Sequence, residues 1–181
     1  GEGDSPTPDF ISRAAADALT AGETFYTYQR GIPDLRQALA DGGFEIHYQP
    51  LVDLQTGAVS GCEALLRWRH PERGMVSPAE FIPIAEENGS ILAIGEWVLR
   101  EAVDQAAHWL SRGLRMPVAV NVSALQFQQA HFVETVAAAL RDAALPASML
   151  ELELTEGVLL GDADENLKRM QAVAALGVTL S

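Results

Sequence analysis

The segment Cys62–Trp68, with the sequence CEALLRW, has the composition of a β-strand. It follows the turn-forming pair Thr56-Gly57 and leads into His70-Pro71. Side chains along a strand alternate between two faces, so Glu63 and Arg67 should lie on the same face. The sequence therefore predicts a strand that carries a carboxylate and a guanidinium on one side.

This pair of side chains suggests a site for a metal ion and a phosphate group. Carboxylate oxygens are the ligands that hard divalent cations prefer, and the guanidinium fork matches two phosphate oxygens at once. The alternative is an ordinary solvated Glu and Arg on an exposed strand. For the strand alone this alternative is preferred, because short polar patterns recur by chance.

Three further motifs occur in a fixed order along the chain. Tyr48-Gln49-Pro50 precedes the strand, and Asn121-Val122-Ser123 and Glu153-Leu154-Thr155-Glu156 follow it. Together with Glu63-Ala64-Leu65, these motifs resemble the EAL family of bacterial cyclic-di-GMP phosphodiesterases. Four ordered matches over more than a hundred residues are much more specific than one tripeptide. The resemblance extends over residues 44–181.

The resemblance implies an α/β fold, namely a TIM-like (β/α)8 barrel of EAL type with an antiparallel first strand, of which about five strands would be present in this chain. The sequence itself supports the antiparallel pair. Only about half a dozen residues separate a predicted strand at residues 44–51 from the strand that begins near Val59, too few for a crossover helix. The strands and helices that follow alternate, which indicates a mostly parallel sheet or barrel.

Periodicity, breakers and capping patterns place the elements beyond the second strand. Capping boxes are predicted at Ser77 with Glu80, at Ser123 with Gln126, and at Asp162 with Glu165. Expected strands cover residues 117–122, 149–155 and 178–181. Expected helices cover residues 78–88, 94–112 and 130–143, and a last one runs from the cap at 162 to about residue 175.

The chain is predicted to have two parts. Residues 1–42 are a linker and helical lead-in, or the tail of an upstream regulatory domain, with helical patterns at 11–19 and 32–40 and strand-like composition at 24–28. Residues 43–181 are the N-terminal portion of an EAL domain. Members of that family continue into an Asp-Asp-Phe-Gly stretch that supplies further site residues. We therefore expect the chain as written to be inactive and its parent protein to be active.

The formal net charge of −13 argues against a partner that is a nucleic-acid polymer and against direct contact with an anionic membrane. An acidic protein still binds an anionic ligand where a divalent cation reverses the local sign of charge. The single cysteine, Cys62, excludes an intrachain disulfide and a cysteine zinc cluster, and it should be a small buried residue. With no long apolar run or signal peptide, a cytoplasmic location is expected, although a parent anchored through a missing segment is compatible with this sequence.

The predicted strand faces bring three oxygen-donating side chains together. Glu63, Asn121 and Glu153 would point to one side of three successive strands, near the barrel end where active sites are built. Two carboxylates and an amide suit Mg²⁺ or Mn²⁺ and suit zinc poorly. The alternatives are an asparagine that merely ends a strand and glutamates paired with a Lys or Arg. The resemblance implies that these three residues are the ligands of a two-metal site, with Glu63 also catalytic.

The resemblance implies further roles around this site. Arg67 matches the family's arginine for the substrate phosphate, and Gln49 lies in a motif beside the substrate, with a structural hydrogen bond as its alternative. Glu156 matches a glutamate counted with the catalytic residues that holds a loop at the rim, with capping or solvent exposure as its alternative. His47 is predicted to be a hydrogen-bonded interior residue, and Glu151 to be interior polar packing or an ion-pair partner.

The reaction implied by the resemblance is the metal-dependent hydrolysis of cyclic-di-GMP to linear pGpG in bacterial second-messenger signalling, by metal-activated water. Its implied partners are the dinucleotide, a second copy in a homodimer, and an upstream sensory or GGDEF-type domain. One alternative is a catalytically inactive EAL-like module that binds cyclic-di-GMP or a protein. A weaker one is an unrelated α/β metalloenzyme.

Overall fold

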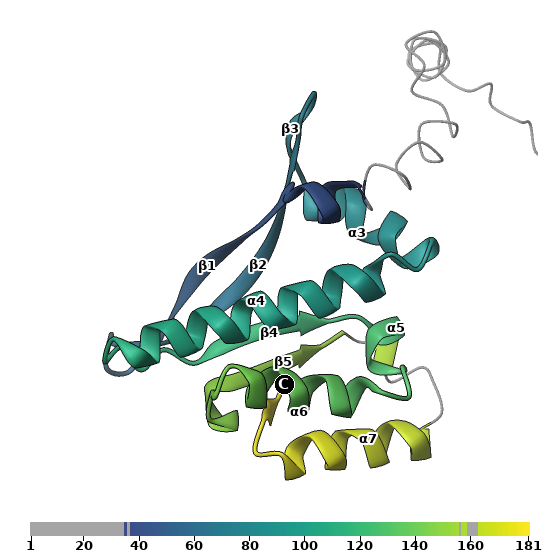
Figure 1. The fold of residues 1–181 in the computed structure, drawn as a ribbon. Helices are drawn as coiled ribbons and strands as arrows, with labels where there is room; N and C mark the ends of the chain where they lie inside the picture. Colours follow the sequence, from purple (N-terminus) through teal and green to yellow (C-terminus); the bar gives the residue numbers. More distant parts are fainter. Residues whose placement is uncertain (1–34, 36, 156, 159–162) are drawn as a thin grey trace, which may run out of the picture.

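The computed structural model describes residues 35, 37–155, 157–158 and 163–181 (Figure 1). The elements predicted at 11–19 and 24–28 lie outside the described residues, as does Glu156. Of the helix expected at 32–40, residues 32–34 and 36 lie outside them too. Residues 35 and 37–41 are helical. None of the described helices is long and apolar enough to span a membrane.

The described elements alternate largely as the sequence predicts. The chain begins with β1 (Phe44–Val52), β2 (Val59–His70), β3 (Gly74–Val76), α3 (Pro78–Glu87) and α4 (Ile91–Ser111). It continues with β4 (Val118–Val122), α5 (Ala124–Phe127), α6 (Phe132–Asp142), the 3-10 turn η1 (Ala147–Met149), β5 (Leu150–Leu154), α7 (Ala163–Ala175) and β6 (Thr179–Leu180).

The strands form one sheet in the order β1-β2-β4-β5-β6, with β3 paired to β2 outside this path. Strand β1 runs antiparallel to β2, and β2, β4, β5 and β6 run parallel to one another. This confirms the antiparallel first pair and the parallel sheet that follows it. It is the arrangement expected of part of a TIM-like barrel.

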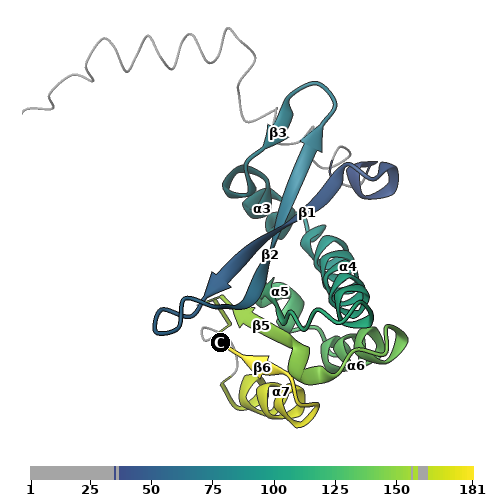
Figure 2. The ribbon, with the colours of Figure 1, turned by 90° about the vertical axis from the view of Figure 1, so that its left-hand side faces the viewer.

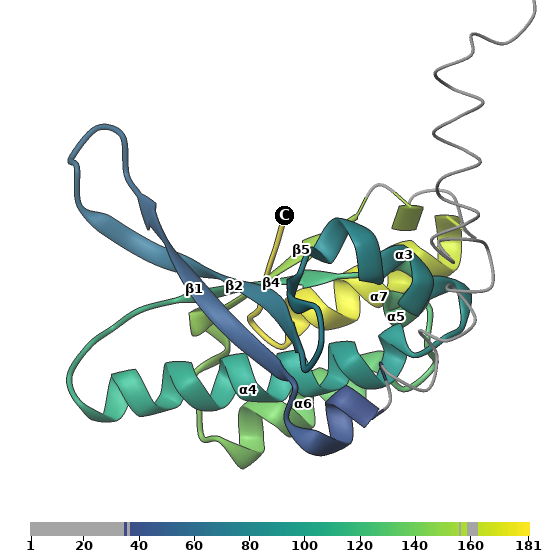
Figure 3. The same cartoon turned by 90° about the horizontal axis from the view of Figure 1, so that it is seen from above.

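A short turn fixes the register of the β1–β2 hairpin. The Asp53 carboxylate accepts hydrogen bonds from the backbone N–H groups of Gln55 and Thr56, at 3.0 and 2.7 Å, and from the Thr56 hydroxyl at 2.9 Å. These bonds hold the pKa of Asp53 below its ordinary value. Gly57 closes the turn with a φ of +71°, which favours glycine. The hairpin tip projects beyond the helices, with Leu54 98% exposed (Figure 3).

The hydrophobic core lies between the sheet and the helices. Cys62, Ala64 and Trp68 of β2 are buried, as their shared face predicts, and burial raises the pKa of the Cys62 thiol to about 11. Buried residues of β4 and β5 continue this face, and α4 and α6 lie against it (Figure 2). Each buried Val or Leu side chain contributes roughly 1.5–3 kcal/mol of apolar transfer free energy.

The structure corrects two predictions around the end of β2. The strand continues to His70, whose Nδ1 accepts hydrogen bonds from the backbone of Glu72 and Arg73, and the chain then returns as β3. The sequence analysis did not predict β3. The capping box expected at Ser77 is also wrong, because the Ser77 side chain makes no capping bond and Glu80 forms an ion pair with Arg73 instead.

Two helix predictions need correction as well. The side chain of Ser123 accepts a hydrogen bond from the Gln126 backbone N–H at 3.2 Å, which confirms the cap, but the helix that it caps is the single turn α5. The sequence predicts that this cap leads to one helix over residues 130–143. The structure has a separate helix, α6, which begins at Phe132. Helix α4 begins at Ile91, earlier than expected.

Helices α4 and α5 approach each other at a glycine. A Cβ atom built on Gly95 would lie 2.6 Å from Cδ and 2.8 Å from Nε2 of Gln126. Gln126 is itself buried and also lines two cavities, so a Cβ atom at position 95 would force its side chain out of its present packing. The close approach of the two helices therefore depends on glycine at position 95.

We expect Gly95→Ala to destabilise the protein, although alanine is the better helix former. The gain in helix propensity is about 1 kcal/mol, whereas overpacking costs about 1–3 kcal/mol. Urea denaturation should show a lower free energy of unfolding, and adding Gln126→Ala should recover part of the loss by removing the clash. A single variant as stable as the wild type would contradict this account.

Candidate active site

Four polar residues named by the sequence analysis lie on one face of the sheet. In the strand register, Gln49 is opposite Glu63, Glu63 is opposite Ala119, and Asn121 is opposite Glu153. Directly opposed residues of neighbouring strands point to the same side. Gln49, Glu63, Asn121 and Glu153 therefore share the face opposite to the hydrophobic core.

A hydrogen bond joins two of these side chains across 58 positions of sequence. Asn121 Nδ2 donates to Glu63 Oε1 at 2.7 Å. The bond uses the amide nitrogen, so the amide oxygen of Asn121 keeps its lone pairs for another partner. The bond also fixes the orientation of the Glu63 carboxylate, which can accept further bonds on its other oxygen.

Three carboxylates concentrate negative charge at the same place. The pKa of Glu153 is raised, first by burial and then by the negative charges of Glu63 and Glu151. Like charges held together favour the protonated form of one of them. Glu151, predicted to be interior packing or an ion-pair partner, thus adds to the local negative potential. A divalent cation among these groups would relieve the repulsion.

The donor set fits a hard divalent cation. Within the described part of the chain, no group of three or more His, Cys, Asp or Glu side chains could hold a metal ion. A site here would therefore combine the carboxylates of Glu63 and Glu153 with the amide oxygen of Asn121. Such an all-oxygen set suits Mg²⁺ or Mn²⁺, and Mg²⁺ usually keeps several water ligands.

The same face of β2 carries two arginines in different surroundings. Arg69 Nη2 lies 3.0 and 3.3 Å from the two carboxylate oxygens of Glu45, so that its charge is matched. Arg67 Nη1 donates instead to the backbone oxygen of Leu66 at 2.9 Å. Among the described residues, no carboxylate forms an ion pair with Arg67. Its guanidinium therefore has the unmatched charge that a phosphate group requires.

The remaining sequence candidates occupy less decisive positions. His47 is hydrogen-bonded as predicted, with Nε2 3.0 Å from Glu45 Oε1, but its side chain is 55% exposed rather than interior. Gln49 is exposed beside Glu63, and Glu156 lies outside the described residues. The sequence analysis missed Glu45, which contacts both His47 and Arg69. Glu45 lies on the same strand face as His47, and this alternation was the feature of the sequence that could have predicted their contact.

A cavity of about 320 Å³ reaches Arg67 and Asn121, whereas Glu63 and Glu153 are not among the residues that line it. The ends of β2 and β4 contribute Arg67 and Asn121 to its wall, and α3 and α4 contribute apolar side chains such as Ile82 and Ile94. An apolar wall with a few polar groups at one side is typical of small-molecule sites. The cavity therefore combines an apolar wall with the cationic side chain of Arg67 and the amide of Asn121.

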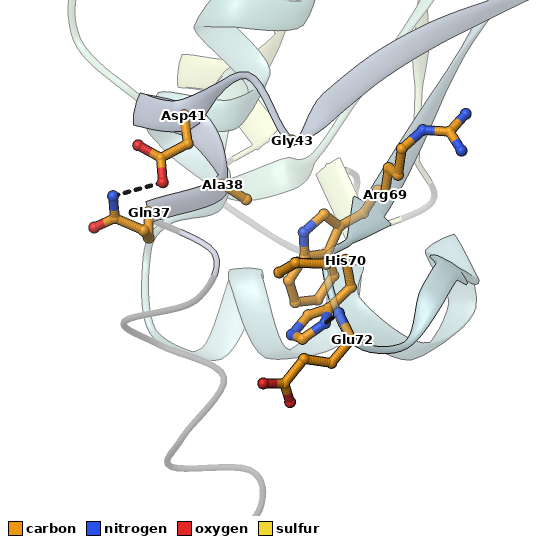
Figure 4. Close-up of a pocket in the computed structure, with 9 residues that line it drawn as sticks. Gln37, Ala38, Asp41, Gly43, Arg69, His70 and Glu72 are labelled. Carbon is orange, nitrogen blue, oxygen red and sulfur yellow. Dashed lines mark hydrogen bonds between the residues drawn. The ribbon is translucent and has the colours of Figure 1, made fainter.

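A second cavity, of about 420 Å³, lies between the helical residues 37–41 and the end of β2 (Figure 4). Gln37 donates to Asp41 at 2.8 Å on one side of it, and Arg69 extends away from this pair. Its lining residues, 37, 38, 41, 43 and 68–72, include none of the candidate metal ligands. Of these two cavities, the smaller is the one that a candidate metal ligand, Asn121, lines.

Comparison with known proteins points to one family. Residues 32–181 match the family model described as the EAL domain. MucR of Pseudomonas aeruginosa, a bifunctional diguanylate cyclase/cyclic di-GMP phosphodiesterase, is 46% identical over 82% of this chain and 22% of its own length. The cyclic di-GMP phosphodiesterase NbdA of the same organism is 44% identical over 82% of this chain and 19% of its own length. The chain thus spans about a fifth of either relative.

Solved structures agree. The PaMucR phosphodiesterase in complex with c-di-GMP superposes with a TM-score of 0.79 at 45% identity, covering 82% of this chain and 61% of that one. The FimX EAL domain of Xanthomonas citri, also in complex with c-diGMP, gives a TM-score of 0.75 at 27% identity, covering 89% and 62%.

The crowding of carboxylates predicts that Glu153→Gln stabilises the metal-free protein at neutral pH. A raised pKa in the folded state means that ionised Glu153 lowers stability as pH rises through that pKa. Solvent screening should keep the gain below about 1 kcal/mol. Thermal unfolding in a chelator should give a higher melting temperature for the variant at pH 7.5, and the difference should shrink at pH 4. An equal or lower melting temperature at pH 7.5 would contradict the electrostatic argument.

Proposed function

Because the chain belongs to the EAL domain family, we propose that it forms part of a domain that hydrolyses cyclic-di-GMP to linear pGpG. The observation that carries this proposal is the convergence of Glu63, Asn121 and Glu153 on one sheet face beside the unmatched guanidinium of Arg67. The named relatives and the two c-di-GMP complexes support the choice of substrate. The chain spans only part of each relative, so the activity is proposed for the complete natural protein.

In this proposal, Glu63, Asn121 and Glu153 hold Mg²⁺ or Mn²⁺ in a two-metal site, with Glu63 also acting as a catalytic residue. When bound, such ions supply a more acidic water and neutralise charge on the phosphoryl group. Asn121 orients the Glu63 carboxylate through the 2.7 Å hydrogen bond. The charges of Glu63 and Glu151, which add to the effect of burial in raising the pKa of Glu153, attract the cations.

The other residues bind and orient the dinucleotide. Arg67 contacts a phosphate through two parallel N–H groups, and Gln49, beside Glu63 on the neighbouring strand, contacts the substrate. The apolar wall from α3 and α4 provides a surface for a base and excludes water from that side. Glu156 holds a loop at the rim of the site.

The setting of the domain is proposed on the same basis. The MucR relative carries two activities by name, which supports an upstream GGDEF-type or other sensory domain in the complete protein. A homodimer and a cytoplasmic location complete the proposal. Bacterial second-messenger signalling is the process in which such a domain would act, since the relatives reported above come from Pseudomonas aeruginosa.

The first test separates catalysis from binding in the complete natural protein. We expect the wild type to hydrolyse cyclic-di-GMP with Mg²⁺, and Glu63→Gln to lower kcat by about 10³-fold, equivalent to about 4 kcal/mol, while calorimetry still detects dinucleotide binding. Glu101→Gln, an exposed glutamate on α4, is the matched control and should keep wild-type activity. A wild type that binds the dinucleotide without cleaving it would favour the inactive binding module.

A second test uses the two arginines of β2. Arg67→Gln should raise the KM or dissociation constant for cyclic-di-GMP about ten-fold, because a charge-assisted bidentate contact with phosphate is lost. Arg69→Gln removes the same charge two residues away and should change either constant less than about two-fold, since Glu45 already matches that charge. Equal effects of the two substitutions would argue for a diffuse electrostatic contribution and against a phosphate contact at Arg67.

A further inference from the structure

Helix α7 places a buried polar side chain next to the segment that follows β5. Asn166 is 5% exposed, and its Nδ2 donates to the backbone oxygen of Val158 at 2.6 Å. Val158 is itself fully buried. A buried amide that donates to a buried carbonyl fixes the distance between the two backbones, because both groups lose their partner if either moves.

Two backbone hydrogen bonds extend this contact to β4. The Val158 N–H donates to the Thr155 oxygen at 3.0 Å, and the Thr155 N–H donates to the Val122 oxygen at 3.4 Å. We call the three bonds from Asn166 to Val122 the β5–α7 tie. Strand β5 ends at Leu154, so among the described residues the Thr155 bond is the last one that joins the carboxyl ends of β4 and β5.

The tie ends beside the candidate metal ligands. Val122 follows Asn121 directly, and Thr155 lies two residues after Glu153. Asn121 and Glu153 are opposite each other in the register of β4 and β5. Helix α7 has a second contact with the rest of the domain, because the Arg169 guanidinium lies 5.7 Å from the centre of the Phe127 ring of α5. A displacement of Val158 would therefore be transmitted to the ends of the two strands rather than absorbed by α7.

We propose that Asn166 is a positioning residue for the metal site, acting through the β5–α7 tie to set the spacing of Asn121 and Glu153. The inference rests on the metal-dependent function proposed above. Mg²⁺ requires nearly ideal octahedral geometry at short ligand distances, so small shifts of its ligands weaken binding. Groups that hydrogen-bond directly to metal ligands change metal affinity about 10–100-fold when they are replaced, and Asn166, which acts through the backbone, should have a smaller effect.

The experiment compares Asn166→Leu with the wild type in the complete natural protein. Titration with Mn²⁺, followed by electron paramagnetic resonance of the free ion, should show a dissociation constant raised about three- to ten-fold. Hydrogen–deuterium exchange should become faster for the segment 153–158, while the segment 166–175 of α7 keeps its protection. Gln171→Leu, an exposed amide on the same helix, should change neither measurement.

A second variant separates the loss of the hydrogen bond from a packing defect that would impair folding. Asn166→Asp has nearly the same volume but presents a carboxylate oxygen to the Val158 carbonyl, so it should give the same two changes without a cavity. If both variants lower the melting temperature yet leave Mn²⁺ affinity within about two-fold of the wild type, Asn166 is merely structural and the inference is wrong. A wild type that binds no Mn²⁺ would overturn it too.

The outcome remains distinct from a failure of the proposed reaction. If the wild type does not hydrolyse cyclic-di-GMP but the Asn166 variants still weaken Mn²⁺ binding, the positioning role holds and the reaction is wrong. If the wild type hydrolyses cyclic-di-GMP and the variants bind Mn²⁺ normally, the reaction holds and the positioning role is wrong.

Discussion

The pairing register of the strands is the constraint on which the site depends. Asn121 opposes Glu153 and Gln49 opposes Glu63, and each pair belongs to strands that are distant in sequence or joined by a turn. A slip by one residue would turn every side chain of a strand to the other face. In β2 it would bring Glu63 into the core and expose the buried Trp68, so the burial that stabilises the fold also fixes the site.

The two faces of the sheet make opposite contributions to stability. Valine and leucine side chains of β4 and β5 are buried against the helices, whereas on the other face burial and then the charges of Glu63 and Glu151 raise the pKa of Glu153. A protein tolerates such repulsion when its core offsets it, and residues at functional sites often lower stability in this way. The arrangement is unfavourable for folding alone and favourable for binding a divalent cation.

The sequence was sufficient wherever local pattern decided the structure. Alternation along β2 predicted the buried face of Cys62 and Trp68, and the short turn at Gly57 predicted the antiparallel hairpin. The sequence was insufficient where a contact with another segment decided the local structure. Strand β3 depends on a turn held by His70, and the cap expected from Glu80 was lost because Arg73 binds that carboxylate. The contact between Asn121 and Glu63 followed from strand faces, but its hydrogen bond required the register. The roles of the site residues stay predictions.

An acidic chain that recognises a phosphodiester must invert its charge locally, and the structure shows where the inversion can occur. With a net charge of −13, the protein as a whole repels anions, so attraction has to come from a few groups close to the ligand. Arg67 and Arg69 are chemically identical and lie on the same strand face, yet Glu45 matches the charge of Arg69 alone. Divalent cations held by Glu63 and Glu153 would provide the rest of the positive charge. The same carboxylates that make the free protein repel a phosphate would therefore make the metal-loaded protein bind it, and Arg67 would set which oxygens face the cations.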